Sequence, residues 1–166
     1  MADTALVTRR GAFLDALDDV DVVSVPLNGA PPPPEATSEI AVHLSAYAAR
    51  SDVGAVLHLH PPVAVMLDAR GDVIRAVTTD HRYYVRNVVA TEFERPGTQA
   101  LGDLVGASVA GGADIVLLRG HGIAVVGPDV DTAYRRAVNF EHAARMTRDL
   151  LLLGDTTTGR PISTGG

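Results

Sequence analysis

The amino-acid sequence predicts an α/β fold. Short runs rich in Val, Ile and Leu, which are typical of strands, alternate with longer segments whose apolar residues recur at helical spacing. Turn-forming pairs such as Gly111-Gly112 and Gly127-Pro128 separate these segments. The chain has 166 residues, is 46% hydrophobic and shows no break in composition, so we expect one domain over residues 1–166.

In the first half of the chain, β-branched residues predict a strand over residues 20–27, before a turn and four consecutive prolines. Apolar residues spaced three or four apart predict a helix over residues 40–50, which Thr37 or Ser38 can cap. An apolar run then predicts a buried strand over residues 53–59. A proline pair admits a short helix over residues 63–69.

In the second half, aromatic and β-branched residues favour a strand over residues 83–90, after a turn at Asp80-His81-Arg82. The tail from Thr156 to Gly166 is small and polar, and we expect it to be flexible. The other predicted elements are helices over residues 99–110 and 131–152 and strands over residues 115–118 and 122–126.

Charge and composition restrict the possible partners. The net charge is -6 and no stretch is rich in Lys or Arg, so we expect a small-molecule substrate and neither nucleic acid nor a membrane surface. No run reaches the 18 or more apolar residues of a membrane span, and the N-terminus does not resemble a signal peptide, so we expect a cytoplasmic protein. Because the chain has no cysteine, a transition metal would need histidine and carboxylate ligands.

Three histidines are placed where they could share a metal ion. His58 and His60 alternate on a predicted strand, so their side chains share a face about 6 to 7 Å apart. His121 follows the strand at residues 115–118, and Gly120 and Gly122 on either side allow a tight turn with room for a ligand. Three neutral imidazoles with an open fourth position form the catalytic type of zinc site.

These motifs together resemble the class II aldolase/adducin family. The resemblance rests on residues 37–44 (TSEIAVHL), 50–62 (RSDVGAVLHLHPP) and 117–127 (LLRGHGIAVVG), followed by a long helix that contains Glu141. It covers about residues 5 to 153. Members of the family include aldolases, an epimerase, dehydratases and decarboxylases.

The resemblance implies a three-layer α/β/α fold with a mainly antiparallel central sheet. It implies a divalent ion on His58, His60 and His121, most often Zn²⁺, with Mn²⁺ or Fe²⁺ as alternatives. It also implies that Glu39 is the catalytic acid and base. Because the family commonly forms tetramers with active sites between subunits, we expect a homo-oligomer.

The substrate-binding residues implied by the resemblance depart from the family pattern. The family's first phosphate loop has no counterpart here, and Thr8-Arg9-Arg10-Gly11 stands where the second loop reads Thr-Pro-Ser-Gly. Guanidinium groups suit a carboxylate as well as a phosphate, so we expect Thr8, Arg9 and Arg10 to bind substrate. Tyr83 and Tyr84 lie near the position of the family's proton-donating tyrosine, and on a strand at most one would face the metal.

The resulting hypothesis is a metal-dependent lyase that stabilises an enediolate or carbanion on a small hydroxycarbonyl or carboxylate compound, by retro-aldol cleavage or decarboxylation. Three alternatives stay open: an epimerase or dehydratase on the same metal site, an Fe(II) oxygenase, and a non-catalytic adducin-like assembly module. Without the resemblance, Glu39 could equally be a helix-start residue that complements the helix dipole. His43, one helical turn after Glu39, is expected to pack beneath the site and not to bind metal.

Overall fold

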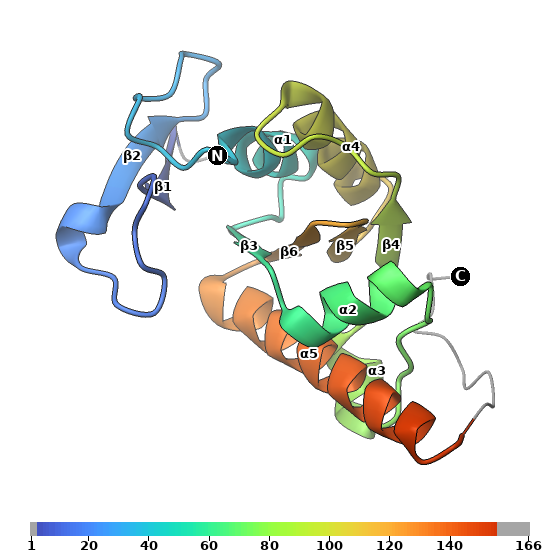
Figure 1. Ribbon diagram of the computed structural model, residues 1–166. Helices are drawn as coiled ribbons and strands as arrows, with labels where there is room; N and C mark the ends of the chain where they lie inside the picture. The colour runs from blue at the N-terminus through green and yellow to red at the C-terminus, as the bar shows by residue number, and fades with distance from the viewer. Residues whose placement is uncertain (1–2, 156–166) are drawn as a thin grey trace.

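A four-stranded sheet in the order β3-β6-β5-β4 lies at the centre of the molecule, whose computed structural model describes residues 3–155 (Figure 1). Strands β3 (Ala55–Leu59), β6 (Gly122–Gly127) and β5 (Ile115–Leu118) pair antiparallel, with His58 opposite Ala124. Strand β4 (Val88–Thr91) pairs parallel with β5. The sheet is therefore mainly antiparallel, as predicted.

Helices cover both faces of this sheet (Figure 1). Helices α1 (Ile40–Ala49) and α4 (Gln99–Ala110) pack on one face, where they bury a cluster that includes Ala124 of β6. On the other face, α2 (Pro62–Arg70), α3 (Thr79–Tyr84) and α5 (Val130–Leu152) form a layer whose core includes Ile123. Because adjacent strand residues point to opposite faces, β6 contributes side chains to both cores. The predicted three-layer fold is confirmed.

A second, two-stranded sheet holds the segment that leads into α1. Strands β1 (Thr4–Thr8) and β2 (Val22–Pro26) pair antiparallel, with a 3-10 turn η1 (Asp19–Asp21) before β2. Val25 of this sheet packs with Ala36 against Ile40 of α1. The backbone N–H of Thr37 donates to the Thr8 carbonyl at 3.0 Å, so this sheet fixes the chain two residues before Glu39.

The predicted strand over residues 83–90 is correct only for residues 88–90, which lie in β4 (Val88–Thr91), and its first part is wrong because the chain forms α3 up to Tyr84. Thr78 caps α3 by accepting from the His81 N–H at 3.2 Å. The buried His81 ring in turn accepts from the Val77 and Thr78 N–H groups at 3.2 and 3.3 Å. These contacts override the strand preference of the two tyrosines.

The other predicted elements occur with boundaries shifted by a few residues, and β1 is an additional strand. Within residues 3–155, no helix is long and apolar enough to cross a bilayer. The predicted flexible tail, Thr156 to Gly166, lies outside the described residues.

Candidate metal centre

The first two histidines lie at the end of β3, an edge strand of the central sheet: His58 belongs to the strand, and His60 directly follows its last residue, Leu59. Val56 packs in the core beneath α1 and α4, and His58 points to the same side because the two residues alternate with Leu57. The His58 Nδ1 donates to the Ile123 carbonyl at 3.0 Å. In the neutral ring this bond places the proton on Nδ1 and leaves Nε2 with a free lone pair.

The third histidine lies at the corner between β5 and β6, and two glycines shape that corner. Gly120 has φ +65°, a left-handed conformation that favours glycine, and the His121 N–H donates to the Leu118 carbonyl at 3.0 Å. At Gly122, a Cβ atom would lie 2.5 Å from the His60 ring and 2.5 Å from the Leu59 carbonyl oxygen. The room that Gly122 provides is therefore occupied by His60.

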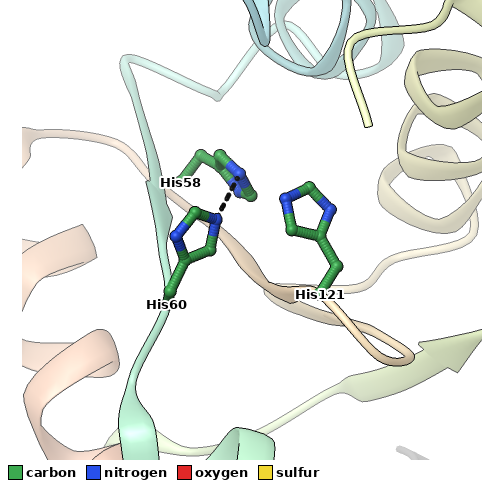
Figure 2. A group of neighbouring side chains, drawn as sticks. All are labelled: His58, His60 and His121. Atoms are coloured by element: carbon green, nitrogen blue, oxygen red, sulfur yellow. Dashed lines mark hydrogen bonds between the residues drawn. The ribbon is translucent and has the colours of Figure 1, made fainter. Parts of the chain in front are cut away.

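The three imidazoles converge (Figure 2). Their ring centroids are 4.9 Å apart for His58 and His60, 4.8 Å for His58 and His121, and 5.0 Å for His60 and His121. One ring nitrogen from each can be chosen so that all three lie within 4.8 Å of one another. The rings come from segments about sixty residues apart, so the fold, and not the local chain, creates this group.

The surroundings favour the neutral form of the His58 and His121 rings. Burial, with a smaller contribution from His121, lowers the pKa of His58 to about 4. Burial also lowers the pKa of His121, although the charge of Glu39 opposes this. Because a metal binds the neutral imidazole, both rings are ready to act as ligands at neutral pH.

Glu39 lies at the start of α1, beside this group. Its N–H donates to the Thr37 hydroxyl at 3.3 Å, and its negative charge opposes the burial that lowers the pKa of His121. Within the described chain, Glu39 Oε2 and His121 Nδ1 are both buried without a hydrogen-bond partner. A buried polar atom without a partner is costly, so Glu39 Oε2 indicates a site built to receive a further group. The His121 nitrogen that faces His58 and His60 is Nε2, on the other side of the ring from Nδ1 (Figure 2).

His43 lies one turn further along α1. Burial lowers its pKa to about 4, and it contributes electrostatically to the lowered pKa of His58. It is not one of the three converging imidazoles. A packing position beneath the site, as the sequence predicted, agrees with these observations.

The structure does not bring the tyrosines to the three histidines within this chain. Tyr83 and Tyr84 belong to α3, in the helix layer on the opposite face of the sheet from α1. Their rings contact each other with centroids 4.8 Å apart, and Arg86 lies over Tyr83 at 5.3 Å. Because both residues lie on a helix, the expectation that strand alternation lets at most one of them face the metal does not apply, and their substrate-binding role stays a prediction.

The Thr8-Arg9-Arg10 turn lies at the end of β1. The Arg9 guanidinium donates to the Val20 carbonyl at 3.3 Å, beside η1. The Arg10 side chain is exposed, and its backbone N–H donates to the Glu35 carbonyl at 2.8 Å. These contacts tie the turn to the segment before Glu39, and the substrate-binding role of all three residues stays a prediction.

Two carboxylates that contact the histidine-bearing segments were not identified from the sequence. Glu141 of α5 accepts from the first free N–H groups of α2, directly after His60. Asp68 of α2 accepts from the Gly120 N–H, next to His121. The only sequence signal for Asp68 is an acidic residue inside an apolar helical stretch, which needs donors if it is buried.

A three-layer α/β/α chain with three converging histidines and a glutamate that has a buried carboxylate oxygen is of the class II aldolase type. The family model described as "Class II Aldolase and Adducin N-terminal domain" matches residues 2–147. The chain therefore belongs to this family.

The relatives agree with this membership. The L-fuculose phosphate aldolase of Methanocaldococcus jannaschii is 24% identical over 145 residues, covering 87% of this chain and 78% of that protein. The 3,4-dihydroxyphthalate decarboxylase of Rhodococcus jostii is 30% identical over 130 residues, covering 71% of this chain and 51% of that protein. The crystal structure of L-fuculose-1-phosphate aldolase from Thermus thermophilus superimposes with a TM-score of 0.80 at 26% identity, covering 93% and 81% of the two chains. Relatives named as aldolases and a decarboxylase confirm the predicted class, a lyase of the class II aldolase family.

Proposed function

We propose that this chain is a divalent-metal-dependent lyase that breaks a C–C bond beside a carbonyl group in a small hydroxycarbonyl or carboxylate compound. The observation that carries this proposal is the convergence of three imidazoles next to a buried carboxylate oxygen without a partner. Family membership supports it, because class II aldolases depend on a divalent metal.

The residues present fit such an ion. His58 and His60 would bind through Nε2, since these two atoms already face each other at 3.2 Å, and His121 would bind through the ring nitrogen that faces them (Figure 2). A set of neutral nitrogen ligands is most typical of Zn²⁺, with Mn²⁺ and Fe²⁺ as alternatives. Bound there, a divalent cation would supply positive charge that stabilises an enediolate.

We assign the proton transfer to Glu39. In retro-aldol cleavage, the hydroxyl proton leaves as the C–C bond breaks, and the carbon that keeps the electron pair must be protonated. In decarboxylation, CO₂ departs and the same carbon takes a proton. A carboxylate that can hold and return one proton serves both reactions, and the free Oε2 of Glu39 is the atom available for it.

Retro-aldol cleavage is our first choice of reaction, because two of the relatives above are named L-fuculose phosphate aldolases. Decarboxylation is the second candidate, which the 30% identity to the decarboxylase favours. Arg9 and Arg10 are proposed to bind a carboxylate or phosphate of the substrate, together with Thr8. An epimerase or dehydratase reaction would use the same metal site and differ only in its products.

The test begins with metal analysis of protein purified without added metal, followed by reconstitution with Zn²⁺, Mn²⁺ or Fe²⁺. Product analysis with a ketose 1-phosphate and with a dihydroxybenzene dicarboxylate then separates aldol cleavage from decarboxylation. Glu39→Gln should keep the metal and lose at least about 100-fold in turnover, because general acid–base catalysis contributes that much. The control Glu35→Gln alters an exposed carboxylate and should stay within about twofold of wild type.

Other results would contradict the proposal. Oxygen uptake by the iron-loaded protein would identify an oxygenase instead. Failure to bind any divalent metal would favour the adducin-like assembly module.

We also propose a homo-oligomer, working in the cytoplasm as the sequence predicted. The exposed side chains of Phe13 and Val20 are apolar, at 77% and 71% exposure, and a groove of about 500 Å³ runs between His60 and Tyr134 of α5. Association with further copies would cover such surface. Light scattering at micromolar concentration tests this, and a monodisperse monomer would contradict it.

A further inference from the structure

Helix α2 follows the segment that carries His58 and His60 and contacts the corner that carries His121. It begins at Pro62, two residues after His60, and β3 runs into it directly below that ring (Figure 2). Near its other end, Asp68 contacts the corner that carries His121. The distance between these two segments therefore depends on how α2 is held.

The start of α2 is held by a side chain from α5. Its N-cap residue is Pro61, which makes no side-chain capping bond. The Glu141 carboxylate accepts instead from the Val63 and Ala64 N–H groups at 3.3 and 3.0 Å. A carboxylate at a helix N-terminus satisfies N–H groups that the helix itself cannot, and its charge is favourable there.

The far end of α2 holds the His121 corner. The Asp68 side chain is only 6% exposed. Its Oδ2 accepts from the Gly120 N–H at 2.9 Å, and its Oδ1 pairs with the Arg119 guanidinium at 3.3 Å. Both donors belong to the two residues before His121, so one carboxylate fixes the peptide that sets the direction of this imidazole.

We propose that Asp68 is a positioning residue for His121, and that α2, held at its start by Glu141, sets the spacing of the three imidazoles. This inference rests on the proposed metal-binding function. Its physical basis is that a metal site loses affinity when a ligand is displaced by a fraction of an ångström, and the contacts behind the ligands prevent that displacement.

The test compares Asp68→Ala with Asp72→Asn. Asp72 lies just beyond the end of α2 and its ion pair with Arg70 is more exposed, so its loss should leave Zn²⁺ affinity within about twofold. Asp68→Ala should weaken Zn²⁺ binding by about 10-fold to 100-fold, measured by competition with a chelator. It should also change the visible absorption of the Co²⁺ form, because the ligand geometry changes.

A purely structural role for Asp68 predicts a different result. In that case Asp68→Ala would lower the thermal stability of the metal-free protein but leave the Co²⁺ spectrum and the Zn²⁺ affinity of the folded fraction unchanged. That result would overturn the inference. If Asp68→Ala does not fold, Asp68→Asn decides the question. Its amide oxygen can still accept from Gly120 but has no charge for Arg119, so a loss of roughly threefold to tenfold is expected, and unchanged affinity would refute us. If wild type itself binds no metal, the proposed function fails and this inference with it.

Discussion

Replacing Gly122 by alanine tests how closely the fold confines His60. A Cβ atom at residue 122 would lie 2.5 Å from both the His60 Cδ2 and the Leu59 carbonyl oxygen. An ordinary contact needs about 3.4 Å, so the His60 ring and the Leu59 carbonyl oxygen must each lie about 0.9 Å further from residue 122. The Leu59 oxygen belongs to the paired backbone of β3 and resists movement, so much of the displacement falls on the imidazole.

The expected cost follows from that displacement. Metal sites tolerate about 0.5 Å of error, and a misplacement of about 1 Å can cost on the order of 100-fold in activity. We therefore expect Gly122→Ala to lose about 10-fold to 100-fold in Zn²⁺ affinity and to lose about 1 to 3 kcal/mol of stability from overpacking.

Calorimetric titration of the metal-free protein with Zn²⁺ measures the affinity, and urea unfolding measures the stability. Gly120→Ala is the matched control, because its Cβ would meet only the Phe93 ring at 3.5 Å and would strain the φ of +65°. It should cost about 1 to 2 kcal/mol of stability with a smaller effect on metal binding. Equal Zn²⁺ affinity for Gly122→Ala and wild type would refute the argument that this glycine seats His60.

Three further predictions concern other parts of the site. His58→Ala removes one of three ligands, so it should weaken metal affinity by more than about 100-fold and lower the metal content of the purified protein. An unchanged metal content would refute the proposed ligand set. His43 has a pKa of about 4 in the folded protein and 6.5 in the unfolded chain, so the unfolded chain takes up the proton first as pH falls. The contribution of neutral His43 to the free energy of unfolding is therefore complete above pH 6.5 and is lost as pH falls towards 4. Between pH 8 and 5 this loss is about 2 kcal/mol, and metal-free His43→Leu should show a correspondingly shallower pH dependence in urea unfolding; an identical dependence would contradict the burial of His43. Gly102→Val should cost about 2 kcal/mol or more in thermal unfolding, because even a Cβ there would lie 2.7 Å from the Ala41 carbonyl oxygen and force α1 away from α4; an unchanged melting temperature would show that the helices can separate freely.

In the mechanism that we propose, Glu39 and the three histidines are held by different parts of the fold. Glu39 lies at the start of α1, whereas His58 lies in β3, His60 directly follows that strand, and His121 lies at the β5–β6 corner. Close packing of α1 on α4 at Gly102 fixes the helix that carries Glu39, and the contacts of α2 fix the segments that carry the histidines. Changes in either layer are therefore expected to alter turnover without touching the substrate.

The sequence by itself determined the secondary structure that carries the site. Alternation placed His58 and His60 on one face of a strand, and the flanking glycines marked His121 as a corner residue, because these signals depend only on the local chain. The strand predicted at residues 83–90 begins only at Val88, because the Thr78 side chain caps a helix over the preceding residues that propensity did not favour.

Only the tertiary structure decided which groups meet. It brought His121 within 5.0 Å of the other rings, left Glu39 Oε2 buried without a partner, and showed that Gly122 seats His60. It also revealed Asp68 and Glu141, whose partners lie about 50 and 80 residues away in the chain. Such contacts leave no local pattern in the sequence, because they depend on the packing of α2 beside α5 on one face of the sheet, which the whole fold determines.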